Sequence, residues 1–93
     1  MTRILIIDDE PITHETLAAL LAGEDYELDF AIDGPTGIAK AKAIAPDIIL
    51  LDLMMPGMDG YAVCTHLRSD ELLAEVPILM ITAFSDRKSR LQG

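Results

Sequence analysis

The sequence predicts a single α/β domain built around a parallel β-sheet, and two observations lead to that fold class. First, four short apolar runs alternate along the 93 residues with segments of helical periodicity. Second, three of these runs are continuous and rich in Ile and Leu, which is typical of strands buried on both faces of a parallel sheet. Strands that alternate with helices join through right-handed crossovers, so the expected element order is β-α-β-α-β-α-β-α.

The four expected strands are short and cover residues 3–7, 26–32, 48–51 and 78–81. The segment 26–32 differs from the others because its polar and apolar side chains alternate. Alternation of this kind favours a strand nearer the edge of the sheet, with one face toward water. The other three strands are expected to be buried on both faces.

The first two helices are expected between the first three strands. Leu17, Leu20 and Leu21 recur at helical spacing, and Gly23 follows them as a helix stop. The second helix is Ala-rich and lies between residues 34 and 46, with a Pro in its first turn. A Pro is tolerated there because its missing N–H would be unpaired anyway.

The third helix is expected over residues 62–67, with Val63 and Leu67 facing inward. Gly60 precedes this helix and is expected to let it begin close to the sheet. A fourth helix is expected to begin near residue 85.

Composition excludes several classes of function. The chain carries 16 Asp and Glu against 7 Lys and Arg, a formal net charge of −9, which disfavours binding to nucleic acid or to an anionic membrane surface. Cys64 is alone, so an intrachain disulfide and a cysteine metal cluster are excluded. No apolar stretch reaches the roughly 18 residues of a membrane span, and no signal-peptide pattern opens the chain. We therefore expect a cytoplasmic protein.

Polar residues follow three of the expected strands. Asp8 and Asp9 follow the first strand, Asp52 follows the third, and Thr82 and Ala83 follow the fourth. Ligands of open α/β sheets bind at the carboxyl ends of the strands, where these side chains would converge. Adjacent carboxylates repel one another, and Mg²⁺ is the cation that favours such oxygen ligands. We expect Asp9 and Asp52 to bind Mg²⁺, Asp8 to hold a coordinated water, and a backbone carbonyl just after Asp52 to assist.

Other roles compete with this prediction. A single Asp after a strand is more often a helix cap or a turn residue than a metal ligand. Two adjacent Asp at one strand end and a third at another favour the metal site instead. His14 and His66 lie on expected helices without a partner pattern, so we expect surface or half-buried side chains rather than ligands.

Three segments in register add a resemblance to a known family. They are residues 4–11, 46–60 and 77–83, of which the stretch from Asp52 to Gly60 is the most specific. Together they resemble the receiver domains of two-component response regulators, over the whole chain. The resemblance implies one receiver domain over residues 1–93, with a flavodoxin-like, doubly wound parallel sheet of strand order 2-1-3-4.

The resemblance also implies a function in two-component signal transduction. Asp52 matches the position that accepts a phosphoryl group from a sensor histidine kinase in a Mg²⁺-dependent reaction. Thr82 matches the hydroxyl residue that bonds the phosphoryl oxygens, and Ala83 matches the small residue beside it. The implied metal ligands are Asp8, Asp9, Asp52 and the backbone carbonyl of Met54.

Receiver domains have five strands and five helices, and the expected elements here stop short of the fifth strand and fifth helix. The family's active-site lysine belongs to that part, and Lys88 falls in the expected fourth helix instead. We therefore expect a truncated form or a fragment of a longer regulator. Its fourth strand would be an apolar edge open to dimer or strand-edge association. A C-terminal output domain or a downstream protein is the expected recipient of the signal.

Three functional hypotheses follow. The first is a phospho-accepting switch that is not an enzyme beyond its own phosphorylation and dephosphorylation. The second is a Mg²⁺-dependent phosphotransferase or phosphohydrolase that uses the same carboxylates. Leu53 and Met54 stand where a hydrolase with an aspartyl nucleophile usually has a second acid, which speaks against this class. The third is a vestigial receiver that acts as an interaction module only.

Overall fold

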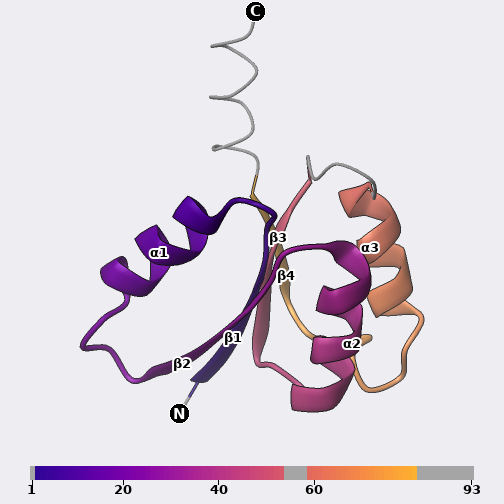
Figure 1. The fold of residues 1–93 in the computed structure, drawn as a ribbon. Coiled ribbons are helices and arrows are strands. Elements are labelled where there is room, and N and C mark those ends of the chain that lie inside the picture. The colour runs from indigo at the N-terminus through magenta and orange to yellow at the C-terminus, as the bar shows by residue number, and fades with distance from the viewer. Residues whose placement is uncertain (1, 54–58, 82–93) are drawn as a thin grey trace, which may run out of the picture.

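The computed structural model describes residues 2–53 and 59–81 of the chain. Four strands and three helices alternate along these residues (Figure 1). In chain order they are β1 (Thr2–Ile7), α1 (Pro11–Leu20), β2 (Tyr26–Ala31), α2 (Gly34–Ile44), β3 (Ile48–Asp52), α3 (Gly60–Arg68) and β4 (Ile78–Ile81). The four expected strands and the first three expected helices are confirmed. The expected fourth helix lies outside the described residues.

The strands form one parallel sheet in the order β2-β1-β3-β4, which confirms the expected strand order. The alternating segment forms β2, which lies at an edge of this sheet as its pattern predicts. Helix α1 covers one face of the sheet, and α2 and α3 cover the other (Figure 1). The domain is therefore doubly wound, and the carboxyl ends of all four strands point to the same end of the molecule.

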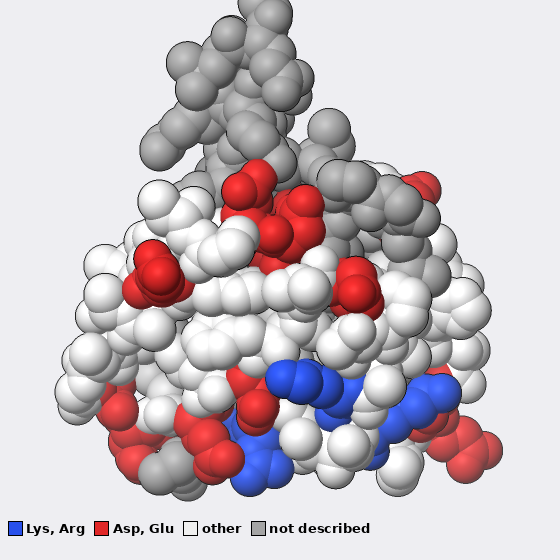
Figure 2. Space-filling model, in the orientation of Figure 1, with Lys and Arg blue, Asp and Glu red and all other residues white. Residues whose placement is uncertain are grey.

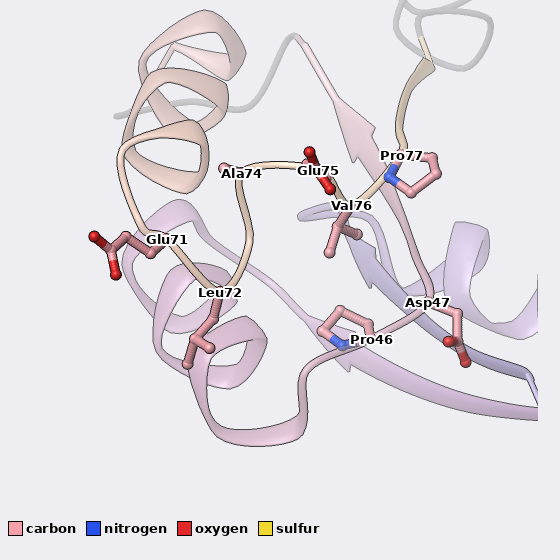
Figure 3. Close-up of a pocket in the computed structure, with 8 residues that line it drawn as sticks. All are labelled: Pro46, Asp47, Glu71, Leu72, Ala74, Glu75, Val76 and Pro77. Carbon is pink, nitrogen blue, oxygen red and sulfur yellow. The ribbon is translucent and has the colours of Figure 1, made fainter.

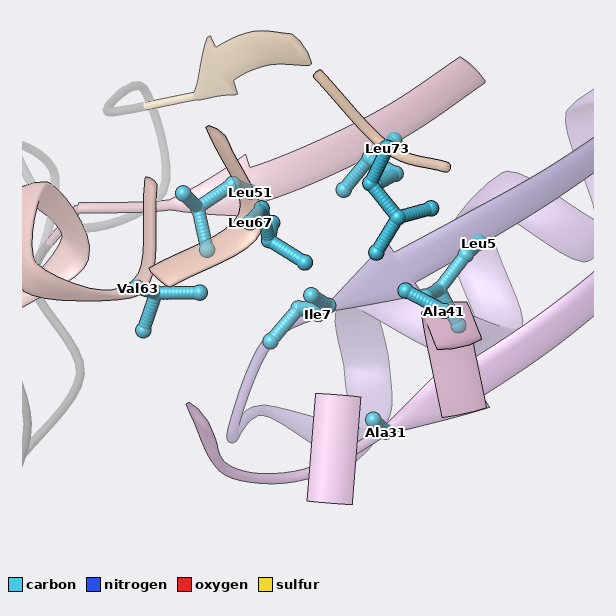
Figure 4. Close-up of a cluster of buried hydrophobic side chains, with 9 residues drawn as sticks. Leu5, Ile7, Ala31, Ala41, Leu51, Val63, Leu67 and Leu73 are labelled. Atoms are coloured by element: carbon cyan, nitrogen blue, oxygen red, sulfur yellow. The ribbon is translucent and has the colours of Figure 1, made fainter. Parts of the chain in front are cut away.

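The apolar core lies between the sheet and the α2–α3 layer (Figure 4). Val63 and Leu67 of α3 are completely buried there, as the sequence predicts. Burial of each such side chain stabilises the fold by about 1.5–3 kcal/mol. The buried cluster consists of Leu5, Ile7, Ala31, Ala41, Ile49, Leu51, Val63, Leu67 and Leu73.

Helix α1 packs on the sheet through one stripe of side chains. Leu20 is 71% exposed and lies outside this stripe, although it shares the helical spacing of Leu17 and Leu21. Thr13 is completely buried, and Leu17 and Leu21 are half-buried. These three residues are spaced by four, which places them on one side of the helix, and Leu20 falls beside that stripe.

Strand β4 is less buried than its continuous apolar sequence predicts. Leu79 and Met80 are 54% and 41% exposed, whereas Ile78 packs against the core. Among the described strands β4 pairs only with β3, so it lies at an edge of the sheet. Burial on both faces is therefore confirmed for the apolar residues of β1 and wrong for β4.

Side-chain hydrogen bonds fix the turns around the helices. Asp33 caps α2 by accepting a hydrogen bond from the Thr36 N–H at 2.7 Å. At the end of α3, the Arg68 guanidinium donates from Nη1 to three backbone carbonyls of the segment that leads to β4. These are the carbonyls of Leu73 at 3.3 Å, Ala74 at 2.9 Å and Val76 at 2.7 Å.

Candidate functional site

The parallel pairing of β1 with β3 brings three carboxylates together. Asp8 and Asp9 follow β1, and Asp52 is the last residue of β3. One oxygen from each of the three lies within 4.8 Å of the others. Figure 2 shows acidic side chains gathered at this end of the molecule, whereas the visible Lys and Arg side chains lie in the opposite half among other acids. The predicted convergence of the three Asp is confirmed.

Burial makes this concentration of negative charge costly. Asp8 is 2% exposed and Asp52 is 3% exposed, while Asp9 is half-buried. Burial raises the pKa of the Asp8 carboxyl above its ordinary value, and the nearby charges of Asp52 and Asp9 raise it further. A hydrogen bond of 2.8 Å from the Glu10 N–H to Asp8 Oδ1 acts in the opposite direction and lowers this pKa.

The donor set fits a hard divalent cation. Mg²⁺ takes oxygen ligands and usually binds through one or two carboxylates together with waters. Asp9 Oδ1 is buried and has no hydrogen-bond partner within the described part of the chain, so it is available as a ligand atom. A bound cation would also offset the repulsion that raises the pKa of Asp8.

Helix α1 supports the backbone of Asp8 through His14, for which the sequence predicted no role in the site. His14 Nε2 lies 2.7 Å from the Asp8 carbonyl oxygen, so this nitrogen carries the proton and donates. The His14 ring stacks on Phe30 of β2, with ring centroids 4.8 Å apart. Thr13, the residue before His14, is completely buried. Both residues follow the acidic pair within the first turn of α1, a placement visible in the sequence, whereas the partners of His14 depend on how the helix packs.

Gly60 allows α3 to begin directly against the end of β3. A Cβ atom at this position would lie 2.6 Å from the Leu53 Cα and 3.2 Å from the Asp52 carbonyl oxygen. Contacts that short with backbone atoms leave no room for a side chain unless the helix and the strand move apart. The expected close approach of this helix to the sheet is confirmed, and it holds the backbone around Asp52.

The other expected site residues are Met54, Thr82 and Ala83, and they lie outside the described residues. The roles assigned to them, and the individual roles of the three Asp, stay predictions. The described part of the site is the acidic cluster with the first turn of α1 beside it.

A separate hollow lies at the other end of the sheet (Figure 3). Its volume is about 520 Å³, and it is lined by residues just before β3 and β4 and by the segment after α3. The lining residues are Pro46, Asp47, Glu71, Leu72, Ala74, Glu75, Val76 and Pro77. These residues precede the strands, whereas the acidic cluster follows them, so the hollow is not part of the carboxylate site.

Within residues 2–53 and 59–81, every helix is too short or too polar to cross a bilayer.

Comparison with known proteins supplies the family. The model of the response regulator receiver domain matches residues 4–93. The response regulator PleD of Caulobacter vibrioides is 48% identical over 91 residues, which cover 98% of this chain and 20% of PleD. The DNA-binding dual master transcriptional regulator RpaA of Synechocystis is 44% identical over 93 residues, which cover 100% of this chain and 39% of RpaA. The chain thus spans less than half the length of these relatives.

Solved structures agree with the sequence relatives. The response regulator TrrA of Thermotoga maritima, in complex with Mg²⁺-BeF, superposes with a TM-score of 0.81 and 36% identity. The match covers 98% of this chain and 77% of TrrA. TrrA has also been crystallised in complex with the histidine kinase ThkA, and that structure matches with a TM-score of 0.79 over 89% of this chain and 70% of TrrA. The acidic cluster, the strand order and these matches agree, and the chain belongs to the response regulator receiver domains.

Proposed function

We propose that this receiver domain is a phospho-accepting switch of two-component signalling and that Asp52 is its acceptor. The observation that carries the proposal is the convergence of Asp52 with Asp8 and Asp9, whose oxygens lie within 4.8 Å of one another at the carboxyl end of the sheet. Asp52 is buried and is the last residue of a central strand, so its carboxylate is held by rigid backbone.

The proposed reaction transfers a phosphoryl group from a phosphohistidine to a carboxylate. An Asp52 oxygen attacks phosphorus, an O–P bond forms, and the N–P bond of the phosphohistidine breaks. The imidazole nitrogen leaves with the electron pair of that bond. The chain's part in this reaction is to hold the nucleophile in line and to arrange charge around it, because phosphoryl transfer needs little other covalent chemistry from a protein.

A divalent cation is the proposed cofactor of this reaction. Asp9 and Asp52 would hold it directly, Asp8 through a water, and Met54 through its backbone carbonyl. Two observations support this assignment. Asp9 Oδ1 has no hydrogen-bond partner among the described residues, and repulsion from Asp52 and Asp9 contributes to the raised pKa of Asp8. A bound cation would offset this repulsion. When bound, Mg²⁺ supplies charge neutralisation for the nucleophile and for the phosphoryl oxygens.

The proposed response to phosphorylation involves Thr82 and Ala83. An aspartyl phosphate adds about −1.5 to −2 units of charge and three acceptor oxygens. The Thr82 hydroxyl would donate to one of these oxygens, and the small Ala83 would leave room for the group. Asp52 pairs with Ile81 across β3 and β4, and this register supports the role of Thr82 as the next residue along the chain.

A sensor histidine kinase is the proposed phosphodonor. The complex of TrrA with the histidine kinase ThkA supports this class of partner, since TrrA is 36% identical to the chain. The signal would then pass to an attached output domain or to a downstream protein. PleD and RpaA, which are longer proteins, support an arrangement with further domains.

Phosphorylation by a small phosphodonor tests the proposal. The 93-residue chain is incubated with phosphoramidate and Mg²⁺, and intact mass reports the addition of one phosphoryl group. We expect phosphorylation of the wild type, none of Asp52→Asn, and none without Mg²⁺. Asp47→Asn is the matched control, because Asp47 lies just before β3, at the opposite end of the strand from Asp52, and its side chain accepts a hydrogen bond from the Arg3 N–H at 2.8 Å.

The other two hypotheses predict different results in the same assay. A vestigial module would take up no phosphoryl group, although its fold is intact by circular dichroism. A phosphohydrolase or phosphotransferase would instead turn over p-nitrophenyl phosphate steadily with Mg²⁺. Equal phosphorylation of the wild type and Asp52→Asn would contradict the assignment of the acceptor.

A further inference from the structure

The peptide unit between Asp8 and Asp9 lies where the chain leaves β1. On one side of Asp8, the backbone still follows the sheet, because the Asp8 N–H donates to the Ala31 carbonyl of β2 at 3.0 Å. On the other side, the Asp8 carbonyl accepts a hydrogen bond from Nε2 of His14 in α1, at 2.7 Å. The backbone unit that leads into Asp9 is therefore held by a helix side chain rather than by a neighbouring strand.

The His14 ring is itself held in place. It is half-buried and stacks on Phe30 of β2, with ring centroids 4.8 Å apart and ring planes 29° from parallel. The backbone of Phe30 is tied to α2 in turn, because Lys40 Nζ donates to the Phe30 carbonyl at 2.6 Å. A donor that neighbouring groups already orient loses little further freedom when it forms its hydrogen bond.

The bond to the Asp8 carbonyl has a consequence for the carboxylate that follows. A peptide unit is planar, so a donor that fixes this carbonyl also fixes the N and Cα atoms of Asp9. Asp9 Oδ1 is buried and has no hydrogen-bond partner among residues 2–53 and 59–81. Within these residues, the direction of this oxygen therefore depends on the backbone that carries it. A carboxylate oxygen of Asp9 lies within 4.8 Å of one from Asp8 and one from Asp52.

We propose that His14 is a positioning residue, whose Nε2–H holds the peptide unit between Asp8 and Asp9 and so directs the Asp9 carboxylate toward a divalent cation. This inference rests on the proposed cation site. The His14 ring is not a ligand of the cation and acts only through the backbone. Removal of a group that orients metal ligands from outside weakens metal binding about 10–100-fold. The lower end of this range applies here, because His14 contacts the main chain before the ligand and not the ligand atom.

Two substitutions of His14 separate its donor from its ring. His14→Phe keeps an aromatic ring that can stack on Phe30 and removes the donor. His14→Gln removes the ring and keeps an N–H at a similar reach from the backbone. We expect His14→Phe to weaken Mg²⁺ binding about tenfold and His14→Gln to stay within about threefold of the wild type. If the ring served packing alone, this order would be reversed.

A titration with MgCl₂ measures the dissociation constant on the unphosphorylated chain. Backbone amide shifts of ¹⁵N-labelled protein report it without a phosphodonor, and the signals come from folded molecules only. His66→Phe is the matched control, because His66 is exposed in the last turn of α3, whereas the first turn of this helix meets the end of β3. We expect the wild-type dissociation constant for this variant.

Phosphorylation separates positioning from a merely structural role. With phosphoramidate as donor, His14→Phe should need about tenfold more Mg²⁺ for half-maximal rate and should reach the wild-type rate at saturating Mg²⁺. Urea unfolding without Mg²⁺ records stability independently. A His14→Phe variant that loses stability but keeps the wild-type dissociation constant would show that the side chain only supports the fold, and the inference would be overturned.

The wild-type ring offers a readout that needs no variant. The proposed bond requires a proton on Nε2 of His14, and long-range ¹H–¹⁵N spectra of the imidazole identify the protonated nitrogen. We expect the Nε2–H form both without and with Mg²⁺. A neutral ring protonated at Nδ1 alone would contradict the inference, even if both variants failed to fold.

The controls separate this inference from the proposed function. If the wild type binds Mg²⁺, Asp9→Asn abolishes binding and His14→Phe leaves it intact, then only the role of His14 is refuted. If the folded wild type shows no Mg²⁺-dependent shifts at all, the cation site and the inference built on it both fail.

Discussion

Replacement of Gly60 by alanine probes how α3 holds the end of β3. The new Cβ would lie 2.6 Å from the Leu53 Cα, whereas carbon atoms in contact are normally about 3.5–4.0 Å apart. The helix and the strand must therefore separate by roughly 1 Å. Overpacking of this kind costs about 1–3 kcal/mol, because the colliding atoms belong to backbone and cannot rotate away.

The expected loss is visible in stability and in phosphorylation. A loss of about 2 kcal/mol lowers the Tm of a domain of this size by about 8–16 °C, measured by circular dichroism. A misplacement of roughly 1 Å at a reacting group costs up to about 100-fold in rate. We therefore expect Gly60→Ala to slow phosphorylation by phosphoramidate at least tenfold, at a temperature at which the variant is fully folded.

Gly23→Ala separates the two effects. Gly23 has a φ of +86°, and a Cβ there meets nothing within 4 Å. Alanine at this position costs about 1–2 kcal/mol through left-handed backbone strain alone. We expect a comparable fall in Tm with an unchanged phosphorylation rate. A Gly60→Ala variant with the wild-type Tm and rate would refute the argument that the close approach of α3 positions Asp52.

Two further predictions concern stability. Without Mg²⁺ at neutral pH, Asp8→Asn should unfold at a higher urea concentration than the wild type. Burial raises the pKa of Asp8 in the folded state above its unfolded value of about 3.9. The wild type therefore loses stability as the pH rises through the folded pKa, whereas the neutral Asn side chain does not. The extra stability of Asp8→Asn over the wild type should vanish as the pH falls to about 3.9. Asp33→Ala should behave oppositely: the pKa of Asp33 is lowered by its bond to Thr36, so this variant should lose stability at neutral pH and the loss should shrink on acidification. A pH-independent difference for Asp8→Asn would contradict the role of burial. Arg68→Ala should lower the free energy of unfolding by about 1 kcal/mol, because three backbone carbonyls lose their charged donor, and urea unfolding measures this loss. An unchanged urea midpoint would show that water replaces the guanidinium without cost.

The strands and the acidic site were predictable because both follow from local pattern. Continuous apolar runs locate β1, β3 and β4, and alternation locates β2 at the edge. Parallel pairing then places the carboxylates after β1 and β3 side by side without knowledge of any long-range contact.

The errors and omissions concern properties that packing decides. Leu20 has the helical spacing of a buried residue, but the rotation of α1 on the sheet places Thr13 inward instead. Leu79 and Met80 have the composition of a buried strand, and their exposure depends on what covers the edge of the sheet. The contact of His14 with the Asp8 carbonyl joins a helix to a strand end, and no periodicity in the sequence encodes such a distance.

The separation of charge along the sheet has a consequence for encounters between molecules. One end carries the acidic cluster, whereas the opposite half mixes acids with the visible Lys and Arg (Figure 2). The charges of the described residues therefore form an electric dipole, and the whole chain carries a net charge of −9. Such a field turns a partner with a positive rim so that the rim faces the acidic end before contact, and it delays an anion that arrives without a counter-charge. Since added salt screens this field over roughly 8–10 Å, the orientation of first encounters depends on ionic strength, even where the final contacts do not.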